Sequence, residues 1–249
     1  MPVGNLMAIR RFPVKSMAGE ALTSAAIDTR GLVGDRLWAV VDAEGKLGSG
    51  KNTRRMRRID GLLRMQASYD ASAAPVPKAS YDASAPTVRL ADGRACRADD
   101  PAMHEWLSRE VGQPVTLARE SAVSHYDDGP VSIVTTAALR ALARVHGAPV
   151  DPRRFRANLV VEWPGDDWVE DDWVGSALTV GDVRLRVDKP LQRCVMVDMA
   201  QAPMTELPDD GTVLKALAAH HGLDFAVLAR VERGGTVRLG DPMAVLAEG

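Results

Sequence analysis

One segment of the sequence combines the residue types that nucleophilic or metal-binding chemistry requires. Cys194 directly follows Arg193, and Lys189 lies five residues before it. Neighbouring cations favour the thiolate over the thiol, and the thiolate is both the nucleophile and the form that ligates metals. The segment therefore predicts a reactive or metal-ligating cysteine. The alternative is a small buried apolar side chain, since free cysteines are among the most buried residues.

The residues before Cys194 predict a strand that positions it. Val183, Leu185 and Val187 alternate with polar residues, which is the period of a half-buried strand. We expect Lys189-Pro190 to end this strand, because proline has no N–H to donate to a neighbouring strand.

Two other stretches have residue types that bind anions. Thr135 and Thr136 stand where a helix is expected to begin, and the N–H groups of a first helical turn attract negative charge. Residues 153–158, Arg-Arg-Phe-Arg-Ala-Asn, then place arginines and an asparagine in a turn before a strand at 159–162. Guanidinium groups suit phosphate oxygens. Plain helix capping and a solvated basic turn are the alternatives.

Residues 45–52 come close to a phosphate-binding P-loop. Asn52, however, stands where Ser or Thr would hold magnesium, and residues 53–58 are strongly basic instead of an apolar helix. We therefore expect a hairpin loop with a solvated basic face, in which Lys51 can still contact an anion.

The composition argues against several classes of protein. A net charge of −2 over 249 residues is not that of a dedicated nucleic-acid binder. Two cysteines are too few for a disulfide scaffold. The sequence begins without a signal peptide, and no apolar run approaches the roughly 20 residues that span a bilayer. We expect a cytoplasmic protein without nucleic-acid or membrane partners.

Many short strands and few helices predict a mainly β fold with barrel-like structure. The expected strands are 6–12, 26–28, 37–42, 87–90, 130–134, 159–162, a hairpin over 178–188 with its turn at Gly181-Asp182, 225–231 and a last pair from 236 to 246. The expected helices are 101–111, a helix after Thr136 that ends at Gly147, and a helix that ends at His221.

Two loops stand out between these elements. A seven-residue repeat at 67–73 and 79–85 is too short for a solenoid and predicts a loose loop around Pro75. Residues 163–173 are acidic and contain three tryptophans. We expect a lid there, with its tryptophans packed inward and its carboxylates in water. A loop that docks a partner is the alternative.

Taken in order, these segments resemble the MOSC family, named for the C-terminal domain of molybdenum cofactor sulfurase. Motifs similar to the N-terminal β-barrel region of the family lie at 12–16, 31–38 and 45–51. Motifs similar to the MOSC domain lie at 130–136, 154–158, 181–182, 193–194 and 240–242. The resemblance implies a mainly β (α+β) fold: an N-terminal MOSC β-barrel-like domain over 1–120 and a MOSC-type β-barrel domain over 121–249.

Within the family the chain resembles the mitochondrial amidoxime-reducing components and their bacterial counterparts. These proteins hold a molybdenum–pterin cofactor between the two regions, with a cysteine thiolate on the metal. The resemblance implies that Cys194 is the catalytic molybdenum ligand, a soft donor suited to such a centre. It also implies a set of residues around the phosphate and pterin of the cofactor: Lys15, Ser16, Arg36, Thr135, Thr136, Arg156, Asn158 and Arg193.

The function implied is a molybdenum-dependent oxidoreductase that reduces small N-hydroxylated molecules to amines. No iron–sulfur cysteine pattern accompanies the motifs, so electrons would come from a separate reductase, ferredoxin or cytochrome-type protein. Two alternatives stay open: a sulfur carrier or sulfurtransferase with a Cys194 persulfide, and a non-catalytic protein that binds or delivers the cofactor. Ala157 and Met17 depart from the usual motifs, which bears on the substrate more than on the fold.

Overall fold

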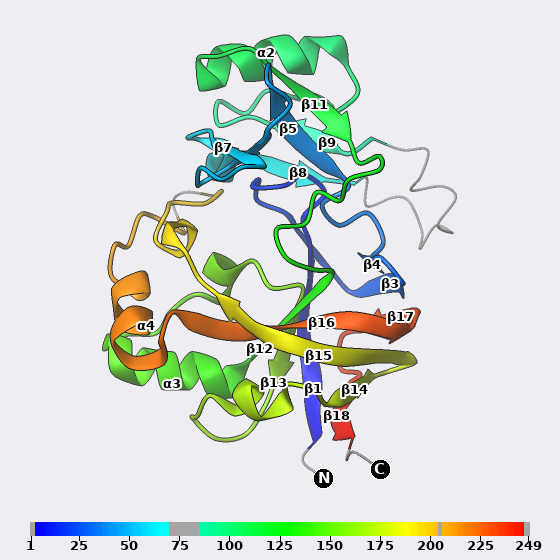
Figure 1. Ribbon diagram of the computed structural model, residues 1–249, viewed down its shortest axis with the longest axis vertical. Coiled ribbons are helices and arrows are strands. Elements are labelled where there is room, and N and C mark those ends of the chain that lie inside the picture. The colour runs from blue at the N-terminus through cyan, green and yellow to red at the C-terminus, as the bar shows by residue number, and fades with distance from the viewer. Residues whose placement is uncertain (1–2, 70–84, 204–205, 247–249) are drawn as a thin grey trace.

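The computed structural model describes residues 3–69, 85–203 and 206–246 (Figure 1). The predicted loop around Pro75 and most of the seven-residue repeat lie outside these residues. The described part has two lobes, with the barrel lobe at the bottom of Figure 1 and the N-terminal lobe at the top. The predicted fold class, mainly β with a few helices and built on a β-barrel, is confirmed.

The barrel lobe is a closed sheet. Its strands pair in the order β13 (Leu159–Glu162), β12 (Val131–Thr135), β16 (Asp224–Arg233), β15 (Val183–Gln192), β14 (Ala177–Val180), β18 (Pro242–Leu246) and β1 (Val3–Arg11). The sheet closes because β1 also pairs with β13. Closure removes the exposed edges at which a sheet would add further strands. Alternate side chains fill the interior, among them Leu6, Ile133, Leu178, Leu185 and Val227.

The first strands of the chain therefore belong to the same core as its second half. β2 (Glu20–Leu22) extends the sheet beyond β1, and β3 (Ser24–Asp28) pairs with β4 (Gly31–Leu32) and with β17 (Gly235–Arg238). The division into domains at residue 120 stays a prediction. In the structure, residues 3–32 lie before this boundary in the sequence but pack with the barrel formed by the second half of the chain.

The N-terminal lobe consists of two small sheets and a helix around a second core. One sheet has the order β11 (Val115–Arg119), β5 (Trp38–Asp42), β6 (Leu47–Ser49) and β7 (Met56–Arg58). The other has the order β10 (Ala95–Arg97), β9 (Thr87–Arg89) and β8 (Gln66–Ser68). Helix α2 (Pro101–Val111) covers them, and Val40, Met65, Val88 and Leu107 pack between the layers.

The helices begin and end where local capping residues stand. The Asp100 carboxylate caps α2, and Gly112 ends it in the left-handed conformation. Gly147 and Gly222 end α3 (Thr136–His146) and α4 (Val213–His221) in the same way. Within the described ranges there are also four short 3₁₀ segments: η1 (Leu62–Arg64), η2 (Pro152–Phe155), η3 (Val169–Trp173) and η4 (Val195–Val197).

The predicted end of a strand at Lys189-Pro190 is wrong, because β15 continues to Gln192. The pairing of β15 with β14 stops at Arg186, so the later residues have only β16 beside them. Pro190 has no N–H, but on the edge that lacks a neighbouring strand no hydrogen bond is lost. The register between β15 and β16 is irregular just before and just after Pro190, which accommodates its ring.

The tryptophan-rich segment closes part of the barrel rather than covering a cavity. Trp163 and Trp173 are buried in the barrel core, with ring centroids 4.9 Å apart in an edge-on arrangement. Two tryptophans thus pack inward as predicted. The prediction that the carboxylates stay in water is wrong for Glu170, which is only 2% exposed. Its Oε1 accepts a hydrogen bond from the Thr135 N–H at 2.7 Å, which ties η3 to the start of α3.

No helix in the described ranges is both long enough and apolar enough to cross a membrane.

Glu170 should make folding depend on pH. Burial raises its pKa to about 7, although the hydrogen bonds from Thr135 oppose the shift. The folded chain then keeps a proton that the unfolded chain releases near its usual pKa of 4.5, so stability should fall as pH rises from about 4.5 to about 7. Glu170→Gln should remove this pH dependence, which amounts to a change of about 3 kcal/mol in the free energy of unfolding.

Urea unfolding of both proteins at about pH 5 and about pH 8 measures this difference. The exposed Glu162→Gln serves as the control and should leave the slope unchanged. A Glu170→Gln protein with the wild-type slope would contradict the account.

Candidate functional site

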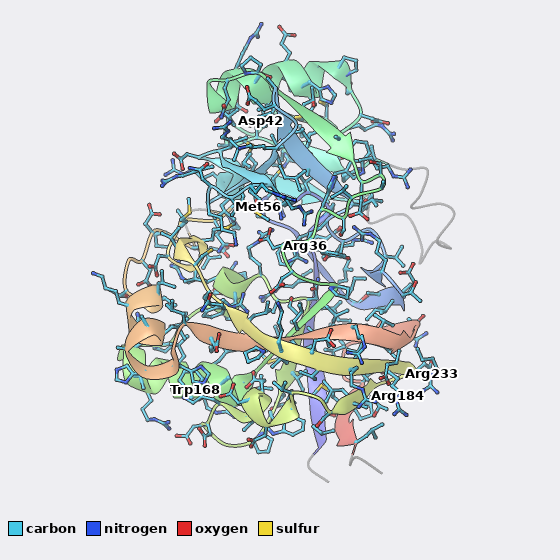
Figure 2. The ribbon with its side chains drawn as sticks, in the orientation of Figure 1. Arg36, Asp42, Met56, Trp168, Arg184 and Arg233 are labelled. Carbon is cyan, nitrogen blue, oxygen red and sulfur yellow. The ribbon has the colours of Figure 1, made fainter. Side chains whose placement is uncertain are left out.

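A cavity of about 300 Å³ lies where the two lobes meet. From the first third of the chain it is lined by Lys15, Ser16, Arg36 and Lys51. From the rest it is lined by Tyr126, Asp127, Asp128, Gly129, Ser132, Arg154, Phe155, Arg156, Asn158, Leu191, Gln192, Arg193, Cys194, Met196, Val197 and Leu228. Figure 2 shows Arg36 at this level, between the lobes. The structure thus brings Cys194 together with six of the eight residues predicted around the cofactor.

The charge of the cavity is strongly positive. Among the described residues, its lining contains six cations and two carboxylates, those of Asp127 and Asp128. Lys15, Arg154 and Arg156 are buried, at 3%, 6% and 9% exposure. Burying a cation costs free energy unless it has hydrogen-bonding or charged partners. The partners of these side chains therefore show what stabilises the site.

Arg36 and Arg156 both lie against the Phe12 ring. Their guanidinium carbons are 4.8 and 4.3 Å from its centroid, within the range of cation–π attraction. Arg156 donates to the Met17 carbonyl at 2.6 Å, and Arg36 forms an ion pair with Asp35. Burial and the nearby Arg36 lower the pKa of Arg156 to about 9. An anion in the cavity would offset the repulsion between these two guanidinium groups.

Lys15 is held by the segment that crosses the cavity at residues 125–129. Its Nζ donates to the His125 carbonyl at 2.9 Å and forms an ion pair with Asp127. Burial lowers the pKa of Lys15, and the Asp127 carboxylate opposes that shift. Burial raises the pKa of Asp127, but Lys15, Lys51 and Arg36 outweigh it and the net shift is downward. Asp127 thus balances several cations of the cavity at once.

Three residues of the cavity have left-handed backbone conformations that side chains rarely adopt. The φ angles are 64° at Ser16, 49° at Arg36 and 53° at Arg156. Such strain costs about 1 kcal/mol or more per residue and persists only where the surroundings impose it. At Ser16 the hydroxyl donates to the Gly48 carbonyl at 3.2 Å, which helps to fix the turn. Strain therefore gathers at the cavity, as is usual for binding sites.

Arg193 reaches across the wall of the cavity beside Cys194. Its Nε donates to the Phe225 carbonyl at 2.8 Å and its Nη1 to the Phe155 carbonyl at 3.0 Å. Its Nη2 is buried and has no partner among the described residues. Burial lowers the pKa of Arg193 to about 10, and Cys194 opposes this shift. A buried donor without an acceptor is costly and marks a place for a ligand atom.

Cys194 is a free, partly buried thiol that lines the cavity just before η4. In the described part of the chain, no group of three or more His, Cys, Asp or Glu side chains could hold a metal. Cys194 is the one thiol in the described lining of this cavity, and Asp127 and Asp128 supply its carboxylates. The cations, the orphan Nη2 and the thiol fit an anionic metal cofactor.

Asn158 lies in the wall but is already engaged. Its Oδ1 accepts from the Ser132 N–H and hydroxyl at 3.1 and 2.9 Å, and its Nδ2 donates to the Arg10 carbonyl at 3.3 Å. These bonds join the start of β13 to β12 and β1. Asn158 thus fixes the barrel strands behind the cavity.

Thr135 and Thr136 do not line the cavity. The Thr135 hydroxyl caps α3 by accepting from the Ala138 N–H. The Thr136 hydroxyl bonds both backbone groups of Trp163, at 3.1 and 2.9 Å. Lys189 is also absent from the lining, since it is exposed and forms an ion pair with Asp128 at 2.6 Å. The plain capping alternative describes Thr135 correctly.

Sequence reasoning missed the segment at 125–129. Tyr126, Asp127 and Asp128 all contribute to the lining. Two acids followed by a glycine and a proline indicate a loop, and nothing in that pattern indicates a partner at Lys15. Lys51 does line the cavity, but residues 45–52 contain strand β6, which pairs with β5 and β7, instead of a P-loop.

Two family models match almost the whole chain. The MOSC N-terminal beta barrel domain matches residues 3–114, and the MOSC domain matches residues 120–244. The chain belongs to the MOSC family.

Individual MOSC proteins are similar over different shares of their length. Mitochondrial amidoxime-reducing component 1 of Mus musculus is 24% identical over 99% of this chain and 83% of its own length. The molybdenum cofactor sulfurase of Drosophila grimshawi is 25% identical over 97% of this chain but only 34% of its own length. The crystal structure of the YUAD protein from Bacillus subtilis covers 97% of this chain and 94% of its own, with a TM-score of 0.51 and 15% identity. That likeness concerns the fold alone.

Removal of the Asp127 charge should strengthen anion binding. Asp127→Asn removes the carboxylate that pairs with Lys15, so pyrophosphate at about pH 6 should bind at least about tenfold more tightly. The matched control is Asp60→Asn, whose exposed carboxylate forms its ion pair with Arg58 outside the cavity lining. Isothermal titration calorimetry measures both. Equal affinities in the two variants would contradict the counter-ion role.

Proposed function

We propose that the cavity binds a molybdenum–pterin cofactor and that the chain reduces N-hydroxylated small molecules. The observation that carries this proposal is the convergence of six cations and one thiol on a single cavity between the lobes. Cations bind the phosphate of such a cofactor, and a soft thiolate suits its metal. The similarity to an amidoxime-reducing component over 99% of this chain supports the same function.

Each part of the cavity has a task under this proposal. Lys15, Arg36 and Arg156 would hold the phosphate, because their charges lie close enough to act on one another in the lining of the cavity. The unpartnered Nη2 of Arg193 would donate to a cofactor atom close to Cys194. Cys194 would supply the protein ligand to the metal. When bound, the cofactor would supply two-electron redox chemistry.

The overall reaction takes two electrons and two protons for each substrate molecule. A hydroxylamine, R–NH–OH, gives the amine R–NH2 and water as its N–O bond breaks. Cys194 is only partly buried, so a small substrate can approach the same wall of the cavity. A separate protein would deliver the electrons.

A second candidate function is sulfur transfer. It is favoured by the free, partly exposed Cys194 thiol beside the partly buried Arg193. The thiolate would attack the outer sulfur of a donor persulfide, R–S–SH. A new S–S bond would form on Cys194 while the donor S–S bond breaks, and the donor would leave as the thiol R–SH.

The two candidates give different results for one pair of variants. If the chain is a reductase, wild type from a host that makes the cofactor should reduce benzamidoxime with reduced methyl viologen, and Cys194→Ser should not. Cys96→Ser is the matched control, since Cys96 lies on β10 outside the cavity. Product formation by liquid chromatography is the measurement.

Full activity in Cys194→Ser would contradict the assignment of Cys194. Cofactor without activity in the wild type would instead indicate a binding or delivery protein. Sulfane sulfur on Cys194 in a protein that lacks molybdenum would favour sulfur transfer.

A further inference from the structure

Three cations beside the cavity form no salt bridge among the described residues, although the Lys51 charge also acts on Asp127. Arg54 and Arg55 are exposed, and Lys51 lines the cavity itself. Over the described ranges, neither Lys51 nor Arg54 has a hydrogen bond or salt bridge, and the Arg55 side chain donates only to the Ser124 carbonyl. The next two arginines differ, because Arg57 and Arg58 are paired with nearby carboxylates.

Two exposed apolar side chains flank these cations. Val195 follows Cys194 and is 45% exposed, and Val123 precedes Ser124 and is 62% exposed. The loop and the cysteine segment lie against each other, since a Cβ added at Gly50 would be 2.5 Å from the Met196 Cγ. We call Lys51, Arg54, Arg55, Val123 and Val195 the rim surface.

The rim surface has the composition of a docking site for an acidic protein. Specific interfaces combine apolar contacts with a charged rim, and charge complementarity steers the partner to its site. The chain as a whole has a net charge of −2, so this positive potential is local to the cavity mouth. Nucleic-acid surfaces usually add aromatic stacking side chains or a broad basic face, and the rim surface has neither.

We propose that the rim surface docks a small acidic electron-carrier protein, such as a plant-type ferredoxin. This inference rests on the proposed reductase function, which takes two electrons per substrate. The chain has two cysteines, too few for an iron–sulfur cluster of its own. A one-electron carrier would dock twice in each cycle, and each time its reduced cluster would lose one electron. Docking at the rim brings that cluster to the wall that contains Cys194.

Charge reversal tests the surface directly. Arg54→Glu/Arg55→Glu should weaken binding of an acidic [2Fe–2S] ferredoxin by at least about tenfold at low salt. The matched control is Arg89→Glu/Arg238→Glu. Arg89 is exposed and donates to one carbonyl, as Arg55 does, and Arg238 is exposed without a salt bridge in the described part of the chain, like Arg54. Titration calorimetry on the purified proteins measures affinity without reference to turnover.

We expect the affinity for ferredoxin to fall in the Arg54/Arg55 variant alone. The wild-type affinity should decrease as salt is added. Equal affinities of wild type and both variants would overturn the proposal. So would binding of duplex DNA or anionic vesicles, but not ferredoxin, through Arg54 and Arg55. Reduction of benzamidoxime with methyl viologen should be unchanged in all three proteins. Its absence from wild type would refute the reductase function, whatever the binding result.

Discussion

Like charges confined in one poorly solvated cavity are the constraint on which this structure depends. Burial lowers the pKa of both Lys15 and Arg156; the nearby Arg36 lowers both further, and Arg156 also lowers that of Lys15. Such a group of cations persists only if carbonyls, an aromatic ring and a carboxylate hold it. Strand β1 makes this possible, because it belongs to the barrel and leads directly into the segment that carries Phe12 and Lys15.

The same constraint connects the fold to ligand binding. A cavity that stores repulsion between cations releases free energy when an anion enters, so the ligand should stabilise the folded chain. Asp127 is the internal substitute for part of that negative charge. Ser16, Arg36 and Arg156, which have left-handed backbone conformations, also line this cavity. Backbone strain of this kind is retained where a binding site requires it. Cys194 and the unpartnered nitrogen of Arg193 then give the cavity one reactive wall.

Features with local causes could be predicted from the sequence, and those with distant causes could not. Helix α2 and its Gly112 cap follow from a proline, a capping aspartate and a glycine within one short segment. The arginine turn before β13 was likewise visible in six consecutive residues. Asp127 could not be found this way, since its partner Lys15 lies 112 positions away. The family resemblance placed Thr136 at the cofactor, and its actual contact with Trp163 could not be predicted because it is also non-local. Strand β15 can pass Pro190 because its pairing with β14 has already ended.

The most direct test of the central claim is the molybdenum and pterin content of purified wild type beside Cys194→Ser, from a host that makes the cofactor. Mass spectrometry of the metal and fluorescence of the oxidised pterin measure both. The account predicts molybdenum and pterin equimolar with the wild-type chain, and molybdenum lost or loosened in Cys194→Ser while Cys96→Ser retains it. A wild type that holds neither, although it is folded and its host makes the cofactor, would contradict the claim that this cavity is built for it.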